Sequence, residues 1–286
     1  MESNYIKSFI NYSGNKYKLL PQILPLFPKE IDTFVDLFCG SGTVGLNVKA
    51  NRHIYNDVNY KIVELLDAIK SNPTFVTITA ISGLIKFYQL SKENEDGFKK
   101  LREYYNNVVS NPVILYTLMC YSFNYQCRFN NKGEYNSSFG RNRSSFTDNQ
   151  RINLIRCSEV LKGQYTTFGR MSFEDFYYDR LMGGDGGDFV YIDPPYYGTT
   201  GSYNDGNRLF GDWTEKQESL LYDIMLLLDE NKIKFAVSNN LAINQEMKEF
   251  LKWTNFNIHH LDMSYGNSNY QKKEKIKDDE VLITNY

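Results

Sequence analysis

The chain has 286 residues, of which 42% are hydrophobic, and a formal net charge of −2; this size suits one globular domain with a large insertion, or two domains. Its apolar runs are shorter than the roughly 20 residues that cross a bilayer, and the opening segment lacks the apolar stretch of a signal peptide, so we expect a cytoplasmic protein. The four cysteines form no CxxC pair and have no metal-ligand spacing with the three histidines, which argues against a zinc or redox site. The small net charge argues weakly against wrapping of nucleic acid over the whole surface, but it allows a local basic face.

Strand and helix patterns alternate at the start of the chain. An apolar run at 33–38 predicts a short buried strand, a glycine turn follows at 40–42, and residues 43–48 favour a helix. A second strand is expected at 53–57, before an amphipathic helix with apolar residues at positions 62, 65, 66 and 69. This order predicts an α/β fold with a doubly wound, Rossmann-like parallel sheet.

The alternation stops between residues 73 and 156. Helical patterns dominate at 85–90, 98–109 and 112–121, and a polar stretch rich in glycine and asparagine follows at 130–149. We therefore expect residues 73–156 to form an inserted, mostly helical subdomain, and residues 1–72 and 157–286 to form the domain that contains the sheet.

The strand pattern resumes at 188–193, a compact apolar run that ends on two prolines. A long polar connection follows, and Thr214 with Gln217 then resembles a capping box for a helix with an apolar stripe. Further strands are expected at 234–237, around 258–261 and at 280–284, which completes the expected sheet.

The glycine turn carries the first chemical signal. Residues 40–45 (GSGTVG) fit the pattern GxGxxG, in which glycines let a cofactor approach the backbone and the N-terminus of a helix offers N–H donors. Asp57 ends the next expected strand, where its carboxylate can accept hydrogen bonds from ribose hydroxyls. These features do not separate a nicotinamide dinucleotide from S-adenosylmethionine, and a tight turn that needs glycine only for its geometry is a further interpretation.

The sharper signal is Asp193-Pro194-Pro195-Tyr196 at the end of a buried strand. The amino nitrogen of adenine is a poor nucleophile because its lone pair is delocalised into the ring. A carboxylate and the Pro194 carbonyl, each accepting one N–H bond, would localise that lone pair, and the prolines fix the backbone without adding a donor. Tyr196 offers a flat face on which an extruded base can stack. We therefore expect Asp193, Pro194 and Tyr196 to be catalytic rather than a plain rigid turn, since open α/β sheets place their sites at the carboxyl ends of strands.

These motifs together resemble the Dam-type DNA adenine-N6 methyltransferases, especially the phage-like members. The shared segments are 12–16 (YSGNK), 34–42 (FVDLFCGSG), Asn56-Asp57 and 193–196 (DPPY), in this order and over essentially the whole chain. The resemblance implies methyl transfer from S-adenosylmethionine, without a metal, to an adenine flipped out of double-stranded DNA. It also implies that Tyr12 and Lys16 contact the cofactor, that Asp57 binds its ribose and that Asp193 bridges the cofactor and the target amine. The full cofactor-binding set that we expect is Tyr12, Lys16, Phe38, Gly40, Gly42, Asp57, Phe173 and Asp193.

The insert is the expected DNA-binding region. Between residues 128 and 156, six basic residues stand against two acidic ones. Eight aromatic residues interleave with the basic ones, and about half of them should be core: Tyr116, Tyr121, Phe123, Tyr125, Phe129, Tyr135, Phe139 and Phe146. Residues 123–140 resemble the hairpin with which the family reads its target, and Arg128 matches a position that contacts guanine. The alternative is that Arg128 pairs internally with an acidic residue. The expected DNA contacts are Phe123 as a wedge, Asn124, Gln126 and Arg128 as base readers, Ser138, and the phosphate-binding Lys132, Arg141 and Arg143.

Two departures bear on the recognition sequence. Gln126 and Ser138 stand where relatives that read GATC typically have an apolar residue and a proline. GATC is therefore only one candidate, and the sequence does not decide between a phage, a restriction-linked and a housekeeping role.

Other functions fit the chain less well. A nicotinamide dehydrogenase would leave residues 193–196 and the basic insert unused. N4-cytosine and protein-glutamine methyltransferases would have serine and asparagine at position 193, and a C5-cytosine enzyme would need a cysteine that follows proline. An RNA adenine methyltransferase and a non-catalytic DNA-binding relative remain alternatives, and no obligate protein partner is indicated.

Overall fold

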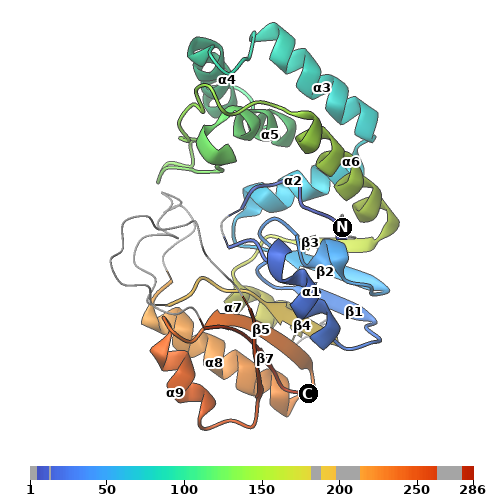
Figure 1. Ribbon diagram of the computed structural model, residues 1–286, viewed down its shortest axis with the longest axis vertical. Helices are drawn as coiled ribbons and strands as arrows, with labels where there is room; N and C mark the ends of the chain where they lie inside the picture. The colour runs from blue at the N-terminus through green and yellow to red at the C-terminus, as the bar shows by residue number, and fades with distance from the viewer. Residues whose placement is uncertain (1–4, 13, 182–187, 198–212, 263–278) are drawn as a thin grey trace.

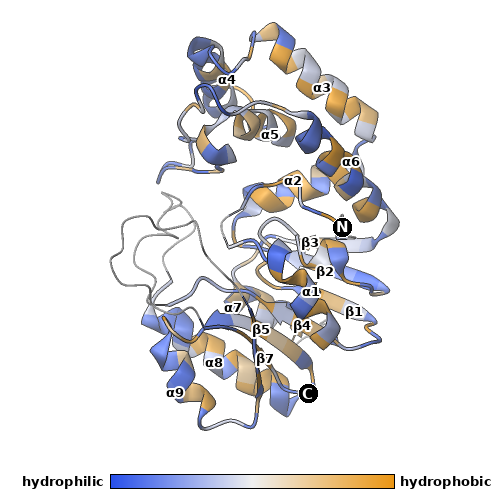
Figure 2. Ribbon diagram, in the orientation of Figure 1, coloured by the Kyte–Doolittle hydropathy of each residue, from blue (hydrophilic) through white to orange (hydrophobic). Residues whose placement is uncertain are grey.

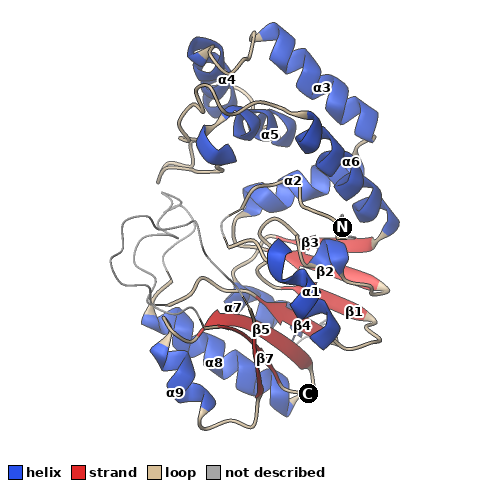
Figure 3. Ribbon diagram, viewed as in Figure 1, coloured by secondary structure: helices blue, strands red, loops and turns tan. Residues whose placement is uncertain are grey.

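The computed structural model describes residues 5–12, 14–181, 188–197, 213–262 and 279–286 (Figure 1). Much of the expected long connection after Tyr196 lies outside these ranges. Within them, the chain builds a twisted sheet covered by helices on both faces, and a helical insert extends from one edge of that sheet (Figure 3).

The sheet has seven strands among the described residues, in the order β3-β2-β1-β4-β5-β7-β6. Strands β3, β2, β1, β4 and β5 are parallel, and β7 lies antiparallel between β5 and β6. The chain order reverses between β1 and β4, which is the point where doubly wound sheets open a crevice at the carboxyl ends of their strands. The strands are β1 (Thr33–Asp36), β2 (Arg52–Asn56), β3 (Tyr165–Gly169), β4 (Phe189–Ile192), β5 (Lys234–Asn240), β6 (Asn257–His260) and β7 (Glu280–Thr284).

Alternate residues of the central strands face opposite layers, as the period of two in a strand requires. Val35 and Val190 pack with helices on one face of the sheet, and Phe34 and Tyr191 pack with the N-terminal helical turns on the other. Both faces are buried, and neither the middle of β1 nor β4 has an exposed polar side. The covering helices are α1 (Leu20–Ile23), α2 (Tyr60–Ser71), α7 (Phe173–Phe176), α8 (Glu215–Glu230) and α9 (Gln245–Leu251).

The insert consists of helices α3 (Thr74–Phe87), α4 (Glu95–Asn107), α5 (Pro112–Tyr121) and α6 (Asp148–Gly163), with an irregular hairpin between α5 and α6. Three of its helices begin at side-chain caps: Asn94 caps α4, Asn111 caps α5 ahead of a proline, and Thr147 forms a capping box with Gln150 at α6. Figure 2 shows hydrophobic residues along α3, where Phe75 and Phe87 are exposed. The expected boundary at residue 156 lies inside α6, which runs from the insert back to β3.

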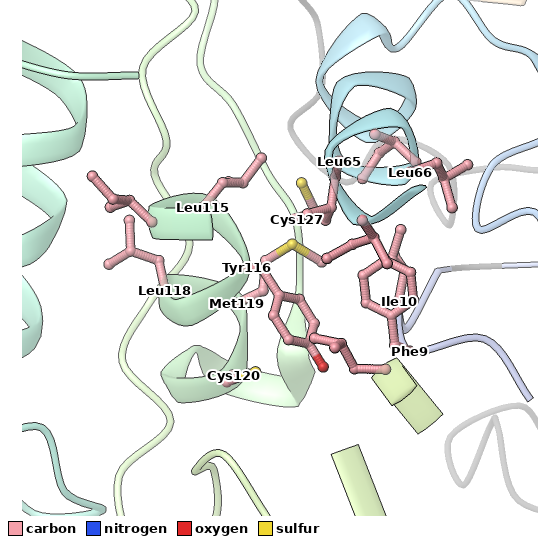
Figure 4. Close-up of a cluster of buried hydrophobic side chains, with 14 of the residues drawn as sticks. Phe9, Ile10, Leu65, Leu66, Leu115, Tyr116, Leu118, Met119, Cys120 and Cys127 are labelled. Atoms are coloured by element: carbon pink, nitrogen blue, oxygen red, sulfur yellow. The ribbon is translucent and has the colours of Figure 1, made fainter. Parts of the chain in front are cut away.

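The insert and the sheet domain share one apolar core. Figure 4 shows Phe9 and Ile10 of the N-terminal segment among Tyr116 and Met119 of α5 and Leu66 of α2. The rings of Phe9 and Tyr116 meet edge to face, with centroids 5.1 Å apart. The segment that leads to the motif at 12–16 therefore joins the insert to the sheet by direct packing.

Most expected elements are confirmed within a few residues, but two local expectations are wrong. Residues 43–48 do not form a helix: only Gly45–Asn47 make a single 3-10 turn, and Val48 is already extended because the chain returns to β2 at Arg52. Of the helical pattern at 85–90, only residues 85–87 are helical, as the end of α3, which begins at Thr74; residues 88–90 lie beyond it. The capping box of Thr214 and Gln217 is present at α8.

Candidate active site and nucleic-acid interface

Three acidic side chains gather at the carboxyl edge of the sheet. Asp36 ends β1, Asp57 follows β2 and Asp193 follows β4, so all three lie at or beside the point where the chain order reverses. Burial raises the pKa of Asp36 to about 8, against a hydrogen bond from the Gly45 N–H that lowers it, and nearby Asp193 and Asp57 raise it further. Asp36 therefore keeps its proton at neutral pH, which limits repulsion among the three carboxyls.

The glycine turn is closed by Asp57. The Gly40 N–H donates to one carboxylate oxygen of Asp57 at 2.8 Å, and the Asn59 N–H donates to the other at 2.8 Å. Gly40 and Gly42 both have positive φ angles, of 46° and 70°, which side chains other than glycine rarely adopt. A Cβ atom at Gly40 would also come within 3.0 Å of the Tyr12 ring, so the turn and Tyr12 meet closely.

Asp193 is paired with Lys16. The Lys16 ammonium lies 2.7 and 2.9 Å from the two carboxylate oxygens of Asp193 and donates to the Gly14 carbonyl at 3.0 Å. Lys16 is 4% exposed and Asp193 is 19% exposed, so the ion pair has a buried cation and a partly buried carboxylate. Burial raises the pKa of Asp193, and the charge and hydrogen bond of Lys16 lower it. The fold thus brings Lys16 and Asp193, which belong to different motifs and are 177 positions apart in the sequence, into direct contact.

Tyr196 completes this cluster. Its ring lies 5.2 Å from the Lys16 ammonium, and its hydroxyl donates to Glu280 at 2.6 Å. Pro194 is buried beside it. The three residues expected to be catalytic therefore occupy one place in the fold, next to Lys16 and Glu280.

An aromatic cluster borders the glycine turn. Phe38 and Phe173, both expected at the cofactor, have ring centroids 5.4 Å apart. Trp213, which the sequence did not single out, lies 5.7 Å from Phe38 and 5.2 Å from Phe173. Its indole N–H donates to buried Glu218 at 2.6 Å, which fixes the ring at the start of α8. Three aromatic rings thus form an apolar wall of the kind on which a purine packs.

The hairpin of the insert presents a strained turn. Isolated bridges join Ser122 to Phe139 and Phe129 to Tyr135. At the base of the hairpin, Asn124 and Tyr125 both have positive φ angles, of 53° and 57°, a conformation uncommon for residues other than glycine. The Asn124 carbonyl accepts a hydrogen bond from the Asn11 side chain at 2.8 Å, which ties this turn to the residue before Tyr12.

Most of the expected DNA contacts lie on or beside this hairpin. Phe123 is 41% exposed, its N–H donates to the Ser138 carbonyl at 2.7 Å, and the Arg143 guanidinium lies 5.1 Å from its ring. Asn124, Ser138 and Lys132 are exposed, and Gln126 is half-buried. Of the eight aromatic residues that interleave with the basic ones, four are buried, as expected: Tyr116, Tyr121, Phe129 and Tyr135.

Arg128 and Arg141 differ in their surroundings. Arg128 is half-buried, and its Nε atom has no hydrogen-bond partner among the residues that the structure describes. Arg141 instead forms an exposed ion pair with Glu95 of α4 at 2.6 Å. Internal pairing, which was the alternative for Arg128, is thus found at Arg141.

Comparison with known sequences covers the region that contains Tyr12, Lys16, Asp57, Asp193 and Tyr196. The family described as D12 class N6 adenine-specific DNA methyltransferases matches residues 12–267, which include both motif regions and the insert. The chain belongs to this family. It is 49% identical over 286 residues to the type II methyltransferase M.FokI of Planomicrobium okeanokoites and 46% identical to the modification methylase StsI of Streptococcus sanguinis, covering 99% of this chain and 43% of each relative. It is 28% identical over 243 residues to the DNA adenine methylase of Escherichia coli strain K12, covering 82% of this chain and 81% of that protein.

The coverage of the longer relatives limits how much of their function can be transferred to this chain. The chain spans less than half the length of M.FokI and StsI. Within the described ranges, no group of three histidine, cysteine or acidic side chains is placed to hold a metal ion, and no helix is long and apolar enough to cross a membrane.

Proposed function

We propose that this chain transfers a methyl group from S-adenosylmethionine to the N6 amino group of an adenine that has been flipped out of double-stranded DNA. The observation that carries the proposal is the position of Asp193, partly buried at the switch point of the sheet and flanked by Lys16 and Tyr196. Membership in the D12 class supports it.

The carboxylate of Asp193 has the chemistry that the amine requires. It accepts a hydrogen bond from one N–H of the adenine amino group, and the Pro194 carbonyl accepts one from the other. The lone pair is then localised on the nitrogen, which can attack the methyl group. Lys16 keeps Asp193 in its acceptor form, because an adjacent ammonium favours the charged carboxylate. Tyr196 stacks on the base and offsets part of the few kcal/mol that unstacking costs.

The residues at the glycine turn fit the cofactor. The close approach of Gly40 to Tyr12 leaves little room for a side chain. Asp57 offers a carboxylate for ribose hydroxyls, and Phe38 with Phe173 offers an apolar wall for the adenine ring. When bound, S-adenosylmethionine supplies an activated methyl group on a sulfonium.

Replacement of Asp57 tests the cofactor assignment. Hydrogen bonds to a charged group contribute roughly 1.5–3 kcal/mol, so we expect Asp57→Ala to weaken S-adenosylhomocysteine binding by at least about tenfold in titration calorimetry. Asp57→Asn, which retains an acceptor oxygen, should lose less. The matched control is Asp67→Ala, which removes an exposed carboxylate paired with Arg170. Unchanged affinity in Asp57→Ala would rule out the ribose contact.

The insert reads the target sequence in this proposal. Arg128, with Asn124 and Gln126 beside it, contacts base edges, whereas Lys132 and Arg143 contact phosphates. Because M.FokI and StsI are more similar to this chain than the E. coli DNA adenine methylase is, we infer a modification role in a restriction system. Gln126 and Ser138, which depart from the pattern of relatives that read GATC, favour a recognition sequence other than GATC.

A labelled-methyl assay separates the proposal from its alternatives. Purified protein and radiolabelled S-adenosylmethionine are incubated with double-stranded DNA, or with RNA of the same base sequence, in the presence of EDTA. We expect label in N6-methyladenine from the DNA only. Label in RNA alone would favour the RNA methyltransferase, and binding to DNA without transfer would favour the non-catalytic relative.

A further inference from the structure

The strongest unassigned feature of the site is a buried glutamate that comes from the far end of the chain. Glu280 is the first residue of β7 and is 1% exposed. It accepts the 2.6 Å hydrogen bond from the Tyr196 hydroxyl, and its carboxylate lies 3.9 Å from the Lys16 ammonium. Glu280 therefore touches two of the residues at the amine-binding position.

The antiparallel course of β7 explains how Glu280 reaches this place. In the register between β5 and β7, Glu280 stands opposite Asn240, the last residue of β5. An antiparallel strand begins at the edge where its parallel neighbours end, so the first residue of β7 lies at the carboxyl edge that holds Asp193.

A carboxylate at such a depth is costly unless it is paired and hydrogen-bonded. Two groups that compensate one of its oxygens belong to the site itself: the hydroxyl of Tyr196 and the ammonium of Lys16. An apolar side chain at position 280 would fill the space but would leave the Tyr196 hydroxyl without this acceptor. The residue is therefore suited to orienting the site more than to filling the core.

We propose that Glu280 is a positioning residue that fixes the ring of Tyr196 for capture of the extruded base. A tyrosine ring still turns about two side-chain torsions, and a bond from its hydroxyl to a buried carboxylate removes that freedom. Hydrogen bonds to an ionised partner are roughly twice as strong as neutral ones, which suits this task. The inference rests on the proposed base capture by Tyr196.

Three variants distinguish the effect of the hydrogen bond between Tyr196 and Glu280 from the effects of the Tyr196 ring and the Glu280 charge. Tyr196→Phe retains the ring and removes the bond, Glu280→Gln retains an acceptor but removes the charge, and the double variant combines them. The matched control is Tyr286→Phe, which removes another hydroxyl bond, to the Leu26 carbonyl at 2.9 Å, outside the site.

Two readouts are measured for each variant. The first is the ratio of affinities for a duplex with the target adenine and a duplex with an abasic site at that position, which reports base capture without chemistry. The second is the single-turnover methylation rate at saturating DNA. We expect Tyr196→Phe to lower both by about tenfold, Glu280→Gln to lower both by a few-fold, and Tyr286→Phe to change neither.

The double variant decides the inference. If Glu280 acts through the Tyr196 hydroxyl, the double variant loses no more than Tyr196→Phe alone, because the bond is already gone. Losses that multiply, or a Tyr196→Phe variant equal to wild type, would overturn the positioning role while leaving methyl transfer intact. A wild-type protein that neither prefers the adenine duplex nor transfers a methyl group would instead overturn the proposed function and this inference together.

Discussion

Asp193→Ala is expected to abolish methyl transfer while the protein remains folded. The variant removes the acceptor that localises the lone pair of the adenine amine. Loss of one preorganised hydrogen-bond donor to a transition state costs roughly 100- to 1000-fold in rate in other enzymes, and we expect at least that loss here. Single-turnover rates at saturating cofactor and DNA measure the loss directly. Rates within a few-fold of wild type would rule out the catalytic role of Asp193.

The control for this experiment must separate chemistry from folding. Removal of Asp193 leaves the buried Lys16 ammonium without its closest partner, and breaking a buried ion pair can itself cost about 3–5 kcal/mol. Asp193→Asn keeps the shape and one acceptor oxygen, so it should retain more stability than Asp193→Ala while still losing most activity. Thermal unfolding of both variants, with S-adenosylhomocysteine binding as a second check, shows whether the site survives.

The pH dependence of the wild-type rate should agree with this assignment. Burial raises the pKa of Asp193 above its usual value, although Lys16 opposes the shift. The carboxylate is the active form, so the rate should be highest above that pKa and fall as the pH drops through it.

Arg128→Ala is expected to lose sequence discrimination at one base pair and to retain general affinity for DNA. A bidentate contact between arginine and guanine contributes roughly 1–3 kcal/mol of discrimination, or about 5- to 150-fold. The buried Nε atom of Arg128, which has no hydrogen-bond partner in the described part of the chain, fits a guanidinium that completes its bonding on DNA. Competition binding with duplexes that differ at single positions measures the effect.

Arg141 and Lys132 provide the comparison for Arg128. Lys132→Ala should weaken all duplexes alike and reduce the salt dependence of binding, since a phosphate contact carries no sequence information. Arg141→Ala should have a smaller effect of the same kind, because Arg141 already pairs with Glu95. If Arg128→Ala and Lys132→Ala shift every duplex equally, the hairpin does not read bases through Arg128.

The sequence predicted the parts of the fold that depend on local pattern. The strands around Phe34, Val190 and Val281 are short apolar runs with both faces buried, and their positions agree with the structure. The edge strand β3 was not predicted, because Tyr165–Gly169 is partly exposed and has no continuous apolar run.

The site was predictable where one motif supplies its geometry and not where distant segments meet. Asp57, Gly40 and Asp193 belong to compact motifs at strand ends, so the carboxyl edge of the sheet could be expected to hold them. Glu280 depends on the antiparallel register of β7 with β5, and no local pattern at residue 280 indicates that register. Trp213 likewise joins the site only through its contact with Phe38, 175 residues earlier in the chain, so no local pattern indicates its place there.

Mapping of methylated bases in cellular DNA tests the central claim most directly. The chain is expressed in a host that lacks adenine methylation, and its DNA is read at single-base resolution beside that from cells with the Asp193→Ala variant. We expect N6-methyladenine at one recurring sequence in the wild-type sample and none in the variant sample. Absence of N6-methyladenine in both samples, with folded protein present, would contradict the assignment of this chain as a DNA adenine methyltransferase.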